Sequence, residues 1–138
     1  MHPMRGMVAK TFQELISWQL ARDLRRTLYE LLRKPVFTED RDFRWQVRRA
    51  ARSATGNIAE GFSCTHAEFA RFLDISARSL REIEDRLIEA VDEGMLTEEE
   101  AAPAFELKKR AATAVSRFTD YLRSTPDPPG FKPHPPKR

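Results

Sequence analysis

The sequence predicts an all-α protein that folds as an antiparallel, up-and-down four-helix bundle. Leu, Ala, Arg and Glu dominate its 138 residues, and these residue types favour helix over strand. Apolar residues recur at intervals of three and four over four separate segments, which is the period of an amphipathic helix. The five glycines and nine prolines gather near the chain ends or between these segments, where they separate helices.

The first helix is predicted over residues 11–33. Thr11 and Glu14 have the spacing of a capping box at its start, and Pro35 follows its end because proline cannot continue the hydrogen-bond ladder. Its periodic apolar residues are Leu15, Trp18, Ala21, Leu24, Leu28 and Leu31.

The second helix is predicted over residues 39–62. Gly61 is expected to stop it, and Gly56 predicts a bend in its interior because glycine weakens a helix. The apolar residues along one side are Phe43, Val47, Ala50, Ala54 and Ile58.

The third helix is predicted over residues 65–93, with Thr65 and Glu68 capping its start and Gly94 ending it. Its near-heptad pattern consists of Phe69, Leu73, Ser76, Leu80, Ile83 and Leu87.

The fourth helix is predicted from Thr97 to residue 124. The Thr97 hydroxyl can cap it, and the three glutamates that follow favour the positive end of the helix. Its apolar residues are Phe105, Ala112, Val115, Phe118 and Leu122.

The chain length suits a single domain with flanking tails. We expect a flexible N-terminus over residues 1–10, the bundle over residues 11–124, and a disordered tail over residues 125–138. This tail is basic and rich in proline, so it cannot bury a core of its own. Its simplest role is a solubilising end, and the alternative is a short linear contact through Phe131.

The composition indicates the cellular compartment of the protein but says little about its binding partner. The 24 basic residues nearly balance the 21 acidic ones, so the net charge of +3 decides little. Cys64 is the single cysteine, which excludes an internal disulfide and favours a reducing compartment. The sequence has no run of about 20 apolar residues for a membrane span, and residues 1–10 lack the apolar core of a signal peptide. We therefore expect a cytoplasmic protein.

Residues typical of catalysis do not form a recognisable constellation. A di-iron bundle needs paired Glu-x-x-His motifs, and none occurs. Small helical ribonucleases of the HEPN class place an arginine four to six residues before a histidine, but neither His66 nor His134 has one there. Cys64 lies near His66 without an orienting group, and no glycine-rich loop could cradle a phosphate. We expect no enzymatic activity, no metal and no cofactor.

The predicted second helix carries a cationic face opposite its apolar side. Arginine can bind phosphate in bidentate fashion, and tryptophan can stack on an unpaired base. This face therefore predicts single-stranded or structured RNA as the ligand, with DNA as an alternative. At 100° per residue the face spans about 140° and contains Arg41, Arg44, Trp45, Arg48, Arg49 and Arg52.

A structural role for the same arginines stays open as the alternative. In that interpretation they pair with an acidic row on the third helix. Glu60 and Glu84 would also be semi-buried partners of Arg48 or Arg49, since an isolated buried carboxylate is costly. The acidic row is Asp74, Glu82, Asp85, Glu89 and Asp92.

The first helix has more apolar surface than one bundle seam requires. Its apolar arc spans about 220°, so a second buried surface is needed. A four-helix domain offers no deep interior position, and another subunit is therefore the expected partner. The arc contains Ile16, Trp18, Leu20, Ala21, Leu24, Leu28, Tyr29, Leu31 and Leu32.

The central part of the chain resembles a known bacterial family. The similarity rests on Gln-Val-Arg-Arg-Ala-Ala at 46–51, Asn-Ile-Ala-Glu-Gly-Phe at 57–62, Glu68-Phe69, Arg71-Phe72-Leu73 and Ser79-Leu80. Together with upstream residues it covers roughly residues 12–123. The chain is similar to the four-helix-bundle family of ribosomal-RNA intervening-sequence proteins, whose relatives include the accessory variability determinant of diversity-generating retroelements.

This resemblance implies a homopentameric barrel without enzymatic activity. It further implies a scaffold that binds RNA or a nucleic-acid-processing partner such as a reverse transcriptase. The alternative is a purely protein-binding assembly module. Many relatives follow the Gly-Phe pair with a basic turn, whereas this chain has Ser-Cys-Thr-His-Ala at 63–67. It also has Thr55-Gly56 where a proline-serine pair is common. These departures argue against nucleic-acid contact through that turn.

Overall fold

The structure is a computed structural model that describes residues 9–133. Over this range it consists of helices and connecting segments without a strand, which confirms the all-α prediction. The predicted flexible residues 1–8 and tail residues 134–138, with His2 and His134, lie outside the described residues. The elements are a short 3₁₀ helix, η1 (Phe12–Glu14), followed by α1 (Ile16–Leu31), α2 (Pro35–Thr38), α3 (Arg41–Gly61), α4 (His66–Asp92) and α5 (Glu98–Ser124).

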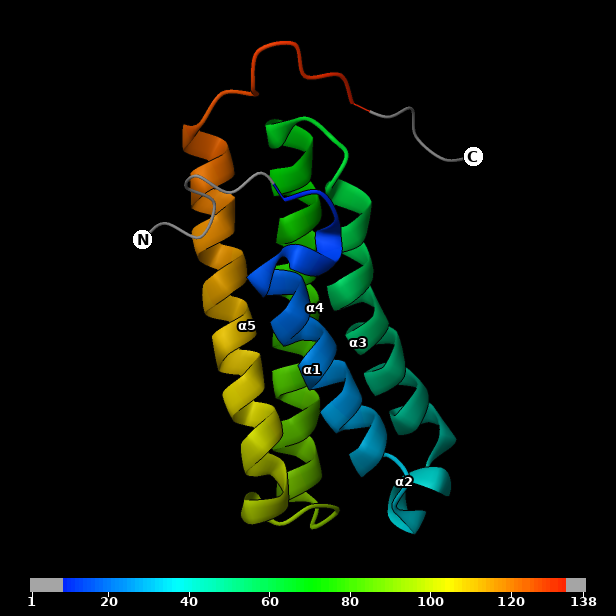
Figure 1. Ribbon diagram of the computed structural model, residues 1–138. Coiled ribbons are helices and arrows are strands. Elements are labelled where there is room, and N and C mark those ends of the chain that lie inside the picture. Colours follow the sequence, from blue (N-terminus) through cyan, green and yellow to red (C-terminus); the bar gives the residue numbers. More distant parts are fainter. Residues whose placement is uncertain (1–8, 134–138) are drawn as a thin grey trace.

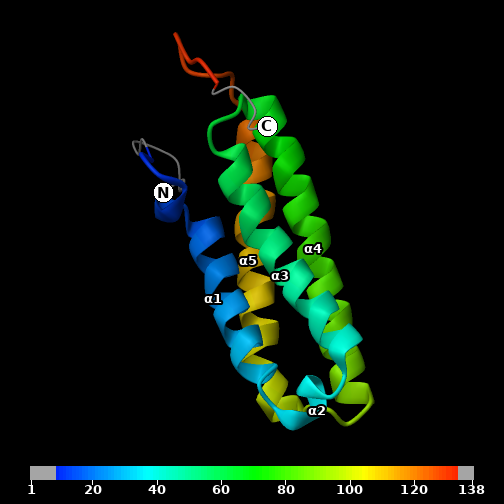
Figure 2. The same cartoon turned by 90° about the vertical axis from the view of Figure 1, so that its right-hand side faces the viewer.

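The four long helices pack side by side as a helical bundle (Figure 1). α1 lies between α3 and α5, and α4 contacts both of these helices from the other side of the core. The short helix α2 lies at the end of the bundle where the chain turns from α1 into α3 (Figure 2). No helix within residues 9–133 combines the length and apolar character needed to cross a membrane.

The first predicted helix is divided into two pieces. Leu15 has extended backbone angles, φ −77° and ψ 129°, and separates η1 from α1. Glu14 accepts a hydrogen bond from the backbone N–H of Thr11 at 3.3 Å, so this capping interaction belongs to η1. The break lets the Phe12 ring pack edge-on against Trp18, with centroids 5.3 Å apart. The predicted helix start at residue 11 is therefore wrong for α1.

The connection between α1 and α3 contains a helix that the sequence analysis missed. Pro35 follows the end of α1, as predicted, but it is also the first residue of α2, where its missing N–H costs nothing. Phe37 of α2 is buried and stacks on Phe43 at a centroid distance of 5.6 Å. Asp40 then caps α3 by accepting from the Phe43 N–H at 3.1 Å. The predicted start of the second helix at residue 39 is two residues early.

The ends of α4 and the start of α5 agree with the predicted caps. Thr65 Oγ1 accepts from the backbone N–H of Glu68 at 3.3 Å, and Gly94 ends this segment at a φ of +73°. Thr97 and Glu100 form a reciprocal capping box with distances of 3.0 and 2.9 Å. Each cap satisfies backbone N–H groups that have no partner within the helix.

Close packing of α3 on α4 depends on small residues. A Cβ atom at Gly61 would lie 2.5 Å from Phe69 Cδ1, so Gly61 does more than stop the helix. The buried Ser76 hydroxyl donates to the Ala54 carbonyl of α3 at 2.7 Å. Gly56 faces open space, and α3 continues as one helix through it.

The bundle itself covers most of the apolar arc of α1. Ala21, Leu24 and Leu28 are buried, and Trp18 is half-buried. Ile16, by contrast, remains 53 % exposed at the start of α1. The exposed apolar surface of α1 is therefore concentrated at its start and does not extend along the whole helix.

Candidate nucleic-acid interface

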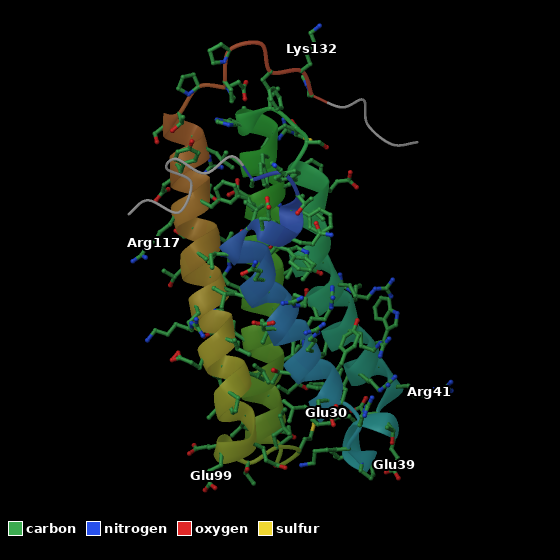
Figure 3. All side chains as sticks on the ribbon, in the orientation of Figure 1. Glu30, Glu39, Arg41, Glu99, Arg117 and Lys132 are labelled. Carbon is green, nitrogen blue, oxygen red and sulfur yellow. The ribbon has the colours of Figure 1, made fainter. Side chains whose placement is uncertain are left out.

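The predicted cationic face of α3 divides into an outward group and an inward group. Arg41, Trp45 and Arg52 are exposed, and their spacings of four and seven residues place them along one side of the helix. We call these three residues the outer face of α3. Trp45 is 61 % exposed, and Figure 3 shows Arg41 extending away from the bundle. Within residues 9–133, neither Arg41 nor Arg52 forms an ion pair.

Arg49 connects the outer face of α3 to the neighbouring helix α4. Its guanidinium donates to a carboxylate oxygen of Glu82 at 2.9 Å and lies 5.4 Å from the centre of the Trp45 ring. The ion pair and the cation–π contact hold Arg49 between two partners. Both side chains of the ion pair retain access to solvent, so the pair itself contributes little to folding stability.

Arg44 and Arg48 turn toward α1 and are half-buried. Arg44 Nε donates to the Leu32 carbonyl at 3.4 Å, and the Arg48 guanidinium covers the Tyr29 ring at 4.5 Å. These contacts join α3 to α1. We conclude that Arg44 and Arg48 have structural partners within the chain.

The acidic row of α4 meets the arginine face of α3 at one position, Glu82. Asp74 instead pairs with Arg123 of α5, while Asp85 and Glu89 both contact Arg86 within α4. Among the residues described, the acidic row and the arginines of α3 therefore form one ion pair, Arg49–Glu82, and not a network.

The expected partners of Glu60 and Glu84 are wrong. Glu60 is exposed, and Glu84 pairs with Lys108 of α5 at 3.1 Å. The Lys108 side chain lies between α4 and α5 and is only 13 % exposed. The Glu84–Lys108 pair could not be predicted from helical projections of α3 and α4, because such projections do not give the position of α5.

Cys64 and His66 each have a separate partner. Cys64 Sγ donates weakly to the Glu60 carbonyl at 3.6 Å. Burial raises the pKa of this thiol, and the carboxylates of Glu68 and Glu60 raise it further, which disfavours a thiolate. His66 Nδ1 instead lies 2.8 Å from the Thr125 carbonyl. Across residues 9–133 no cluster of His, Cys, Asp and Glu could hold a metal ion.

His66 also connects the start of α4 to the segment after α5. Its backbone N–H donates to the Asp127 carboxylate at 2.7 Å, and its ring packs near Tyr121 with centroids 6.1 Å apart. The first residues of the predicted tail thus contact the bundle. These contacts were not predictable from local sequence signals, because they join positions about 60 residues apart.

Helix α1 carries a cation–π pair of its own and a second arginine that contacts α3, and neither was predicted from the sequence. Arg22 covers the Trp18 ring at 5.2 Å, and Arg25 donates to the Thr55 hydroxyl of α3 at 2.9 Å. The signal was present, since Arg22 follows Trp18 by four residues and so lies on the same side of the helix.

Comparison with known proteins identifies a matching family. The family described as 23S rRNA-intervening sequence protein matches residues 13–116, a range that includes α1 to α4 and most of α5. No curated protein and no solved structure matches the chain. The outer face of α3 lies within the matched range.

Proposed function

Because the chain belongs to the 23S rRNA-intervening sequence protein family, we propose that it is a non-enzymatic, oligomeric helical scaffold that binds RNA through the outer face of α3. The family name points to an RNA-related role. The residues of α3 supply the chemistry that such a role requires, namely exposed cations for phosphate and an exposed aromatic ring for bases.

Exposure of Trp45 is the observation that carries this proposal. A tryptophan that is 61 % exposed on a helix leaves its indole ring accessible to a stacking base. Arg41 lies one turn before it and Arg52 about two turns after it. A base stacked on Trp45 would therefore have cations on both sides for its flanking phosphates.

Unpaired bases fit this surface better than a regular duplex does. The indole ring can stack only on a base whose face is free, and such stacking tolerates any base. The ligand class we propose is therefore single-stranded RNA or the unpaired loop of a structured RNA. DNA with unpaired bases is the competing ligand in any binding experiment.

The wider assembly is proposed with the same function. We infer an antiparallel arrangement of four helices that assembles into a pentameric barrel, as the resemblance of the central motifs implies. In the cytoplasm this barrel would present several copies of the α3 face to RNA or to a nucleic-acid-processing enzyme such as a reverse transcriptase. The absence of a recognisable catalytic constellation in the sequence favours a scaffold over an enzyme.

Replacing Trp45 by alanine tests the proposed ligand class. Affinity for an unpaired RNA oligonucleotide should fall by about 1–3 kcal/mol, while affinity for a fully paired duplex of the same sequence should change little. Ile75→Ala, a truncation at another exposed apolar position, is the matched control. Equal affinity of wild-type and Trp45→Ala protein for the unpaired RNA would contradict the proposal.

A protein-binding assembly module without nucleic-acid affinity is the second candidate. It is favoured by the arginines that already have partners, namely Arg44 with Leu32, Arg48 with Tyr29, and Arg49 with Glu82 and Trp45. In this case the outer face of α3 would bind an acidic protein surface. Wild-type protein with salt-sensitive affinity for neither RNA nor DNA at micromolar concentration would favour this candidate.

A further inference from the structure

A groove between the start of α1 and the middle of α5 combines an apolar floor with a cationic rim. Ile16, 53 % exposed, and the half-buried Leu20 line it from α1. Lys109, Arg110 and Arg117 line it from α5. None of these three cations forms an ion pair within the described range 9–133, and Arg117 extends away from the bundle (Figure 3). We call this surface the basic groove.

A second groove, between the end of α4 and the start of α5, has the opposite charge. Ile88 is 46 % exposed there, and the half-buried Phe105 lies beside it. Its acidic residues are Asp92, Glu98 and Glu106. These carboxylates form no ion pair with other residues in the described part of the chain. We call this surface the acidic groove.

The lining of the basic groove favours a protein partner over RNA. It contains aliphatic side chains and no aromatic ring, so it lacks the stacking platform that the outer face of α3 has. An apolar floor with cations around it fits an apolar surface with carboxylates around it, because both the buried area and the charges then match. The acidic groove has this chemistry. We propose that the basic groove of one copy binds the acidic groove edge of a second copy of this chain.

The positions of the two grooves indicate how such copies would assemble. Glu106 and Lys109 line both grooves, so the two surfaces adjoin on α5 instead of lying on opposite sides of the bundle. A contact between two different surfaces is heterologous, and repeating it gives a ring when the rotation from copy to copy closes and an open filament when it does not. Adjoining surfaces impose a rotation between successive copies. The expected assembly is a ring with α5 near its axis, which rests on the oligomeric part of the proposed function and gives it a specific interface.

Replacing Ile16 by aspartate tests the apolar part of this interface. The side chain is more than half exposed in one copy, so the substitution should leave the helical fold intact, as checked by circular dichroism. Light scattering at micromolar concentration should show an oligomer for wild-type protein and a shift toward the 16.0 kDa chain mass for Ile16→Asp. Ile75→Asp, at an exposed position outside both grooves, should keep the wild-type mass. An Ile16→Asp protein that also keeps it overturns the interface.

Charge reversal tests the electrostatic part of this interface, and a combined variant tests whether the oligomer can be restored. Arg110→Glu with Arg117→Glu should dissociate the oligomer, and Asp92→Lys with Glu98→Lys should do the same. All four substitutions in one chain restore opposite charges across the contact and should restore the wild-type mass. Failure of this rescue overturns the proposed pairing. Wild-type protein of 16.0 kDa would overturn both the interface and the oligomeric part of the proposed function, whereas the RNA-binding part is decided separately by Trp45→Ala.

Discussion

Gly61 of α3 lies so close to Phe69 of α4 that a Cβ atom would come within 2.5 Å of the ring carbon Cδ1. The same Cβ would lie 3.0 Å from Phe72 Cβ, which belongs to a part of the side chain that cannot swing away. The two helices therefore meet at a point where only glycine fits. This contact gives the Glu-Gly-Phe segment at 60–62 a packing role that needs no ligand.

We predict that Gly61→Ala destabilises the fold by about 1–3 kcal/mol, the usual cost of overpacking a core. Gly56→Ala is the matched control, because open space surrounds Gly56. In an exposed helix interior this change should stabilise by about 0.5–1 kcal/mol. Urea denaturation of both variants measures the two free energies of unfolding. A Gly61→Ala protein as stable as the wild type would show that the helices can separate at no cost.

Arg48 and Tyr29 are predicted to be coupled in stability. The guanidinium lies 4.5 Å from the ring centre and joins α3 to α1, so a cation–π coupling of about 0.5–2 kcal/mol is expected. A double-mutant cycle with Arg48→Gln and Tyr29→Leu measures this coupling directly. Arg41→Gln, at an exposed position without an ion pair among the described residues, should leave stability nearly unchanged. Zero coupling in the cycle would return Arg48 to the set of candidate ligand residues.

Truncation of the C-terminal segment should distinguish its first residues from the rest. Removing residues 128–138 leaves the contacts of His66 with Thr125 and Asp127 intact, so the melting temperature should not change. Removing residues 125–138 deletes both contacts and should lower stability by about 1–2 kcal/mol, given the usual worth of a hydrogen bond. Thermal denaturation of the two truncated proteins checks this. Identical melting temperatures would mean that the His66 contacts add nothing to the fold.

The Cys64 thiol should react slowly with alkylating reagents. Burial and the carboxylates of Glu68 and Glu60 raise its pKa, and the thiolate is the reactive form. The rate of iodoacetamide alkylation should rise with pH around a midpoint above that of a small free thiol. Because the folded-state pKa is raised, this group's contribution to stability is present below its unfolded pKa and is lost as pH rises through its folded pKa. A midpoint at or below that of the free thiol would contradict the assigned environment.

Local signals in the sequence predicted much of the helical framework. Thr65, Gly94 and Thr97 act within one helical turn of the backbone they cap, so α4 and the start of α5 were predictable. The break at Leu15 was not predictable from the sequence, because it depends on the packing of Phe12 against Trp18. Pro35 predicts the end of one helix, but it also begins α2, which is stabilised by the burial of Phe37.

The candidate site was predictable only as a list of residues. A helical projection describes directions around one axis, and it placed the arginines and Trp45 opposite the apolar residues of α3. It could not separate Arg48, which covers Tyr29 of α1, from Arg52, which is exposed. That separation depends on where the neighbouring helices lie. The basic and acidic grooves were missed for the same reason, because each is formed by two helices.

The salt dependence of RNA binding tests the central claim most directly. Arg41→Gln with Arg52→Gln removes both cations of the outer face of α3, and Arg78→Gln with Arg81→Gln removes two exposed cations of α4 as the matched control. If the outer face holds phosphates, the first double variant should bind unpaired RNA more weakly, and the slope of log affinity against log salt should shrink by about 1.4, or about 0.7 for each lost contact. The α4 variant should keep the wild-type slope, and both should keep the wild-type melting temperature. A slope and an affinity unchanged by the loss of Arg41 and Arg52 would contradict the claim that this face binds RNA.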